Sequence, residues 1–185
     1  MRYSGLFLIL LAAGCGSGNE ARFLIDPPAA TAEVPVRVAT IELREVSLPA
    51  YAAAVEIAQQ EETGALRNLP ETLWADDPVR GVTIALARAL DQATTATAAA
   101  EPWPLDEPAQ ARVEVRVERM FAGTDGQFRF AGQYAIASPD GVIRERVQRF
   151  DIAIPIAAEG AAGIAEASGN AISRLALDIA SDLRR

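Results

Sequence analysis

Few residues of this 185-residue sequence have the types and spacing that catalysis or metal binding requires. Histidine is absent, which removes the usual general base and the usual imidazole metal ligand. No serine lies in a Gly-x-Ser-x-Gly elbow. The best acidic candidate for a calcium loop, Asp76-Asp77, is followed by proline, which is typical of a helix start. The sequence therefore predicts a protein that is not an enzyme, with no catalytic, cofactor-binding or metal site, and leaves Cys15 as its one reactive group.

Cys15 follows a segment with the order of a secretory signal peptide. Arg2 provides a positive start, residues 6–11 are apolar throughout, and small residues come next. The apolar run is too short to span a bilayer as a helix. Ala-Ala-Gly-Cys, preceded by Leu11, resembles the lipobox of bacterial lipoproteins. This resemblance implies cleavage between Gly14 and Cys15, and attachment of fatty acyl chains such as palmitate to Cys15. An ordinary signal peptide with an incidental cysteine is the alternative.

The composition fits one folded domain held at a membrane by its acyl chains. Removing the 14 signal residues leaves 171 of the 185, which is enough to bury a core without a disulfide or a metal. Residues 15–22 form a tether and residues 23–185 a single domain. Eight residues of fully extended chain reach at most roughly 26–29 Å. The net charge of −8 argues against nucleic-acid binding and against adhesion to anionic headgroups as the main membrane contact.

Alternating apolar residues predict several strands with one buried face. The first half of the chain contains a short strand at 23–25, a strand at 34–43 and a hairpin formed by 55–60 and 65–69. A further short strand is expected around Trp103. The second half contains a meander of three antiparallel strands at 112–121, 127–137 and 142–156. The apolar positions of the last strand change from odd to even numbers, which predicts a β-bulge near Val147–Arg149.

Two segments have the three- and four-residue spacing of amphipathic helices. Asp77-Pro78 begins the first, which is expected to run to about Thr97. The second is expected over 161–183, with Gly169 as a mild weak point. One-sided strands and helices bury each other most simply in layers. The predicted fold is α+β, with a mixed, mainly antiparallel sheet and two helices packed on one face.

The order of these segments resembles the PqiC/YmbA-like auxiliary lipoproteins of ABC-type transport systems in Gram-negative envelopes. Phe23-Leu24-Ile25 stands where that family has an aromatic-leucine strand after its tether. The segment Val-Ser-Leu-Pro-Ala-Tyr, ending at Tyr51, follows a strand as in the family. Trp74 precedes the first helix, and 113–137 matches its strand, glycine-rich turn and strand. The resemblance covers the chain from the lipobox to the last helix.

The resemblance implies a non-catalytic subunit that docks an MCE-domain lipid tunnel at the outer membrane. Its expected partners are the MCE-domain protein with its permease and ATPase, the membrane through the lipid anchor, and further copies of the same chain. Gly16, rather than aspartate, follows Cys15, which favours the periplasmic face of the outer membrane over the inner membrane. The alternatives are a periplasmic lipid carrier with an acyl-chain pocket between helices and sheet, and a structural envelope lipoprotein.

A few surface candidates have two readings each. Trp74 could mark a partner groove, but a lid on the core is the favoured interpretation. Leu177 and Ile84 lie off their helix stripes and could form an oligomer contact, although tolerated exposure is the commoner explanation. Trp103 between prolines has the same ambiguity as Trp74. The alternating charges of the first meander strand could meet a partner, but a solvated face is the default; they are Arg112, Glu114, Arg116 and Glu118.

Overall fold

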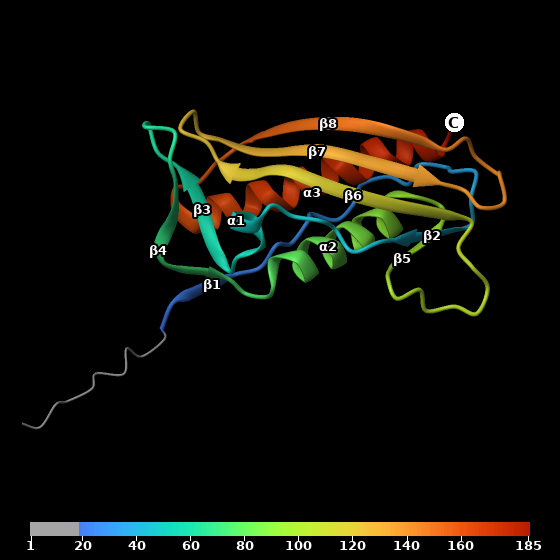
Figure 1. Ribbon diagram of the computed structural model, residues 1–185, viewed down its shortest axis with the longest axis horizontal. Helices are drawn as coiled ribbons and strands as arrows, with labels where there is room; N and C mark the ends of the chain where they lie inside the picture. Colours follow the sequence, from blue (N-terminus) through green and yellow to red (C-terminus); the bar gives the residue numbers. More distant parts are fainter. Residues whose placement is uncertain (1–18) are drawn as a thin grey trace, which may run out of the picture.

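The computed structural model describes residues 19–185, which form one eight-stranded mixed sheet with helices on one face (Figure 1). The predicted α+β class is therefore confirmed, and most paired residues lie in antiparallel ladders. The strands are β1 (Ala21–Phe23), β2 (Thr40–Leu43), β3 (Glu56–Gln60), β4 (Leu66–Trp74), β5 (Thr97–Ala100), β6 (Ala111–Ala122), β7 (Gln127–Ala137) and β8 (Arg146–Pro155). The helices are α1 (Ala50–Ala53), α2 (Pro78–Ala93) and α3 (Gly160–Leu183).

Strand β6 is the centre of the sheet. One of its edges pairs with β7 along almost its whole length, and β7 pairs in turn with β8. Its other edge is shared, because β2 pairs near its start and β3 meets it near its end. The predicted three-strand meander and the predicted hairpin, β3 with β4, are both present. Parallel pairing of β1 with β4 and of β5 with β2 completes the sheet.

The alternation of β6 sets its two faces. Val113 and Val115 are fully buried beneath the helices, while the charged residues that alternate with them, Arg112, Glu114 and Arg116, point to the opposite face. A bulge lies in this strand, where the register with β7 shifts between Val117 and Arg119. The predicted bulge near Val147–Arg149 is wrong, since β8 pairs with β7 without interruption. The phase change in the sequence arises because Ile143 precedes the strand and is buried from a turn.

Gly132 of β7 is the residue opposite the bulge. A Cβ built at this position would lie 2.1 Å from the backbone oxygen of Arg116 and 3.0 Å from the Cα of Val117. Such distances are far shorter than van der Waals contact, so any larger residue would push the two strands apart. The glycine that appears among the aromatic residues of this strand is therefore required by the close approach of its neighbour.

Helix α2 begins as predicted and ends earlier. The side chain of Asp77 accepts a hydrogen bond from the backbone N–H of Arg80 at 2.9 Å, and Pro78 occupies the first turn. The helix stops at Ala93 rather than near Thr97, because Thr94 is extended and its hydroxyl donates to the carbonyl of Leu90. The residues that follow form β5. The expected strand around Trp103 is wrong, because that residue lies in the loop after β5.

The segment between β1 and β2 lies across the two long helices. The backbone N–H of Val34 donates to Ala93 at 2.7 Å, and that of Arg37 donates to Leu183 at 3.3 Å. The strand expected over 34–43 is consequently reduced to its last four residues. Gly169 of α3 faces the same segment, and a Cβ there would lie 2.4 Å from the oxygen of Asp26. This glycine permits close packing and is more than a weak point in the helix.

Candidate functional site

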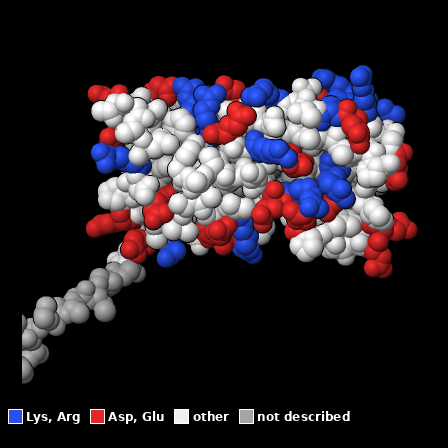
Figure 2. Space-filling model, in the orientation of Figure 1, with Lys and Arg blue, Asp and Glu red and all other residues white. Residues whose placement is uncertain are grey.

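Most arginine side chains of residues 19–185 form an ion pair with an acidic side chain, although acids outnumber arginines. On the open face of the sheet, Arg116 contacts Glu114 at 2.6 Å and Arg149 contacts Glu118 at 3.4 Å. Figure 2 shows positive and negative side chains interspersed over the visible surface. Across residues 19–185 no cluster of His, Cys, Asp and Glu side chains is arranged to hold a metal ion. The alternating charges of β6 therefore form ion pairs on this face, both within β6 and with β8.

A buried polar cluster fastens the end of α3 to the sheet. The hydroxyl of Tyr134 donates a hydrogen bond of 2.7 Å to Asp182, and Arg146 contacts the other carboxylate oxygen at 3.1 Å. Burial, and then the hydrogen bond and negative charge of Asp182, raise the pKa of Tyr134 well above its ordinary value. The phenol therefore stays protonated at neutral pH. It cannot act as a base there, and the arrangement is that of a clamp.

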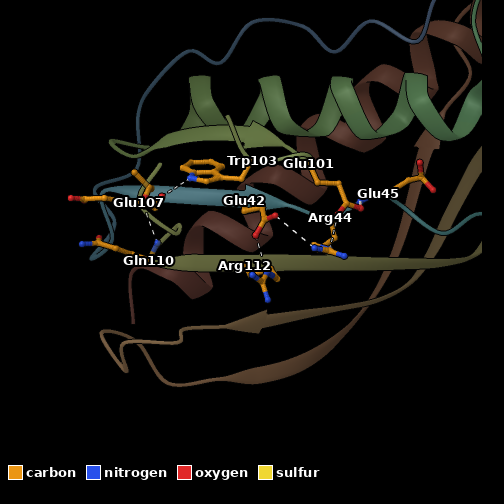
Figure 3. A network of polar contacts seen from close by, with 9 residues as sticks. Glu42, Arg44, Glu45, Glu101, Trp103, Glu107, Gln110 and Arg112 are labelled. Atoms are coloured by element: carbon orange, nitrogen blue, oxygen red, sulfur yellow. Dashed lines mark hydrogen bonds and ion pairs between the residues drawn. The ribbon is translucent and has the colours of Figure 1, made fainter. Parts of the chain in front are cut away.

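A second network surrounds Glu42, which is almost fully buried (Figure 3). Its carboxylate accepts a hydrogen bond of 2.8 Å from Arg112 and lies 3.7 Å from Arg44. Arg44 also contacts Glu101 at 2.9 Å, and Glu101 accepts from the backbone N–H of Glu45 at 2.7 Å. The network thereby joins β2 and β6 to the end of β5. Each member has a charged partner, so its role is structural.

The loop after β5 is held by polar contacts of its own. The indole N–H of Trp103 donates to the carbonyl of Glu107 at 2.8 Å, and the side chain of Gln110 accepts from Ala39 at 2.7 Å. Within the described part of the chain, no buried side-chain nitrogen or oxygen lacks a hydrogen-bond partner. An unpaired buried group aimed at a missing ligand, which often marks a binding site, is therefore absent from residues 19–185.

The hollows of the domain are surface grooves. The first apolar groove, of about 330 Å³, lies between β1 and the first half of α2; its lining includes Phe23, Leu24, Ile25, Trp74 and Ile84. A second apolar groove, of about 250 Å³, lies between α2, α3 and the segment 28–34 that crosses them. Larger and more polar hollows lie between β8 and α3 and at the turns of the two hairpins, with volumes of about 590 and 890 Å³.

The interior between sheet and helices is nearly filled. A void lined by Trp74, Phe128 and Ile164 measures only about 10 Å³, which is no more than one water molecule needs. The large core side chains around it are almost completely buried. The interior around this void is therefore packed too tightly for an acyl chain, and the larger hollow between β8 and α3 is an open groove with a mainly polar lining.

The structure brings Trp74 and Ile84 together at the first apolar groove and places Leu177 at the second. Trp74 is 4 % exposed, packs in the core and contributes to the lining of the first apolar groove. Leu177, 43 % exposed, lines the second groove, whereas Ile84 lines the first. Tyr51 packs edge-on against Phe121 and its hydroxyl accepts from the N–H of Met120 at 3.1 Å. Residues 1–18, which include the cleavage site Gly14–Cys15, lie outside the described residues.

Sequence reasoning missed three residues. Leu24 was assigned to a strand interior, but β1 ends at Phe23 and leaves Leu24 68 % exposed. The position of Glu42 on the face opposite the core could have been predicted, because it is a lone acid between two apolar strand residues. Its burial on that face depends on the contact with Arg112, which the local sequence does not show. Asp182 gave no signal, because its burial depends on the distant residues Tyr134 and Arg146. No helix in the described residues is long and apolar enough to cross a membrane.

Comparison with known proteins assigns the fold. Residues 23–180 match the family described as the ABC-type transport auxiliary lipoprotein component. A crystal structure of an uncharacterised protein superposes with a TM-score of 0.68 at 15 % identity, covering 80 % of this chain and 94 % of the other. Protein XCC0632 from Xanthomonas campestris, a member of the family DUF330, superposes with a TM-score of 0.60 at 14 % identity. The match covers 86 % of this chain and 90 % of that protein.

Two further comparisons add little. A PelC dodecamer from Paraburkholderia phytofirmans gives a TM-score of 0.39 at 13 % identity, covering 85 % of this chain and 96 % of that one. This similarity is too low to support an argument about assembly. No curated protein matches the sequence significantly. At these identities the solved structures bear on the fold alone.

Proposed function

This chain belongs to the ABC-type transport auxiliary lipoprotein family, and on that premise we propose that it is a lipid-anchored periplasmic subunit of an intermembrane lipid transport system. The observation that carries the proposal is the family match over residues 23–180, immediately downstream of a lipobox at Cys15. In this proposal the acyl chains of Cys15 hold the domain at the periplasmic face of the outer membrane. The domain docks an MCE-domain tunnel, which works with a permease and an ATPase.

The chemistry of the domain supports a docking role without catalysis. Its buried carboxylates, Glu42 and Asp182, are each engaged by arginines, and its buried tyrosine is held protonated. A reactive site needs groups whose protonation or partners are left available for a substrate. A domain whose buried polar side chains are all paired internally, as they are in residues 19–185, can instead bind a partner through the shape of its surface. Surface complementarity is what an adaptor requires.

The lipid-carrier alternative receives less support. A carrier would need a hollow that removes most of an acyl chain from water. The hollows of suitable volume are open grooves, and the apolar ones measure about 330 and 250 Å³. Mass spectrometry of organic extracts from the purified protein separates the two functions. A stoichiometric lipid in addition to the covalent acyl chains would support the carrier.

Membrane fractionation of the Cys15→Ser variant tests the anchor. The native chain should sediment with outer-membrane markers on a density gradient and incorporate labelled palmitate. The variant should do neither while keeping its fold by circular dichroism. Retention of the variant in the membrane fraction would contradict anchoring through Cys15, and sedimentation of the native chain with inner-membrane markers would contradict the outer-membrane assignment.

Co-purification tests the partner. The acylated protein, extracted in mild detergent, should co-elute with the MCE-domain protein of its host on size exclusion, at a mass that also reports self-association. A monomer that elutes alone over a range of salt concentrations and detergents would contradict both parts of the docking proposal. A third function, that of a purely structural envelope lipoprotein, predicts this negative result.

A further inference from the structure

The first apolar groove contains two exposed aliphatic side chains side by side on one surface. Leu24 is 68 % exposed, the highest value among the large apolar residues of 19–185, and Ile84 is 44 % exposed. Both line the groove between β1 and α2, whose floor includes Trp74. Exposed apolar residues are ordinary when scattered singly. Two that converge on one concave apolar surface call for something to cover them.

The groove lies where the chain leaves the folded domain. Figure 1 shows β1 at the margin of the molecule where the described residues begin, and Leu24 follows β1 directly. Leu24 is nine residues after Cys15, a distance of at most roughly 30–32 Å for extended chain. An anchor at Cys15 therefore keeps this groove within reach of the bilayer. Strand β8, on the opposite side of the view, is further from the point of attachment.

Two of the three aspartates that line the groove are paired with arginines, and the third, Asp77, caps the start of α2. Arg88 is paired with Asp26, and Arg80 is paired with Asp76, across and beside the apolar residues. Both arginine side chains remain about half exposed or more, at 48 % and 64 %. Long arginine stems can lie along an apolar surface while their heads reach a polar layer. The rim carries a net charge of −1, from three aspartates against two arginines, so only a small part of the −8 of the whole chain lies at the groove.

We propose that Leu24 and Ile84 insert into the interfacial layer of the bilayer to which the chain is anchored. Interfacial apolar residues penetrate about 5–10 Å, to the boundary of headgroups and acyl chains. This contact gives the anchored domain a fixed orientation relative to the bilayer. The β1–α2 side then faces the membrane, and the edge strand β8, with its charged side chains, faces the periplasm. The inference rests on the proposed acylation of Cys15 and adds the orientation of the domain to it.

Fluorescent labels in the acylated protein test the orientation. Because acylation consumes the thiol of Cys15, a cysteine introduced at Leu24→Cys or Ile84→Cys is the one available for labelling. The acylated protein is reconstituted, at about one copy per vesicle, into vesicles of phosphatidylethanolamine and phosphatidylglycerol. An environment-sensitive dye such as NBD is then exposed to lipids that carry a doxyl quencher in the acyl chain.

The matched control is Val147→Cys. Val147 is 64 % exposed, almost as much as Leu24, but it lies on β8. We expect a blue-shifted emission and several-fold stronger lipid quenching at positions 24 and 84 than at 147. Equal quenching at all three positions, in protein that still floats with the vesicles, would overturn the orientation while leaving the anchor intact. Failure to float would instead refute the anchor itself.

Discussion

Both faces of the β6–β7–β8 meander contain an ion pair between an acid and an arginine, but the two pairs have different roles. On the helix side, Asp182 and Arg146 form an ion pair whose side chains are 8 % and 17 % exposed, and Tyr134 completes the group. On the open side, Glu118 and Arg149 form a pair whose side chains are 52 % and 75 % exposed. An acid and an arginine in water gain little from pairing, whereas buried partners depend on each other. The first pair positions a helix, and the second keeps a surface soluble.

The buried pair provides the largest expected effect. Asp182→Ala leaves the largely buried side chain of Arg146 and the hydroxyl of Tyr134 without their partner. Breaking a buried ion pair in this way costs about 3–5 kcal/mol. We expect the free energy of unfolding in urea to fall by about that amount, with circular dichroism showing the native fold in the absence of denaturant.

Asp178→Ala is the matched control for this change. Asp178 lies one turn earlier on α3 and contacts Arg174 at 3.2 Å, with side chains that are 37 % and 64 % exposed. Removing it should cost about 0.5 kcal/mol or less. Equal losses for the two variants would show that burial does not distinguish these pairs.

Gly132 tests the sheet between the two faces. Gly132→Ala places a methyl group 2.1 Å from the oxygen of Arg116, against backbone that cannot rotate aside. Overpacking of this kind costs about 1–3 kcal/mol, and we expect the upper end of that range. The measurement is the midpoint temperature of thermal unfolding, which should fall because the strained bulge destabilises the folded state.

The control is Gly81→Ala on α2. A Cβ at Gly81 would meet nothing closer than an Ile25 methyl at 3.9 Å. Alanine favours a helix interior over glycine by roughly 1 kcal/mol, so this variant should be stabilised. Opposite signs for the two substitutions are the specific expectation, and destabilisation by Gly81→Ala or a neutral Gly132→Ala would contradict the packing described at each site.

How far the sequence predicted these features depends on how local their causes are. The faces of β6 could be predicted, since alternation of valine with charged residues is written along the strand itself. The bulge was detectable too, because the buried residues of β6 change from odd numbers at Val117 to an even number at Met120. The phase change near Val147 was the more conspicuous signal, but it reflects the start of a strand. The sequence contains both patterns and does not rank them.

The remaining features depend on residues far apart in the chain. The strand expected over 34–43 is shortened because residues 34–37 bond to the ends of both long helices, which local alternation cannot show. The clamp at Asp182 joins α3 to strands more than thirty residues earlier in the chain. The groove at Leu24 exists because β1 stops one residue before it. Such contacts follow from the tertiary arrangement, which local sequence patterns do not encode.

Alkaline pH should lower the stability of the protein by a smaller amount, through Tyr134 on the helix side of the meander. The raised pKa of Tyr134 means that the folded protein keeps its phenol proton where the unfolded chain, with a tyrosine pKa near 10, releases it. This contribution to stability is complete below about pH 10 and is lost as the pH rises further. The expected slope is at most about 1.4 kcal/mol per pH unit.

The sequence makes this measurement unusually clean. It contains no lysine, and arginine stays charged throughout the range, so few other groups titrate there. Urea unfolding followed from pH 8 to 12 should show a decline that Tyr134→Phe weakens. The variant itself should lose about 1 kcal/mol at neutral pH, the value of one hydrogen bond. A decline of unchanged slope in Tyr134→Phe would mean that the clamp is not its source.

The exposed pair of Glu118 and Arg149 should give the smallest change in stability. Because the fold does not depend on this pair, its substitution can test whether the open face binds a partner. Glu118→Ala removes a partner that Arg149 meets at 3.4 Å in water, and exposed pairs contribute about 0–1 kcal/mol. We expect less than about 0.5 kcal/mol of change in urea unfolding. If this face instead docks the tunnel subunit, the same variant would weaken co-purification, with a dependence on salt that charged contacts confer. An unchanged stability together with unchanged partner binding would assign the open face to solvent alone and direct the search for the docking surface to the groove beside Leu177.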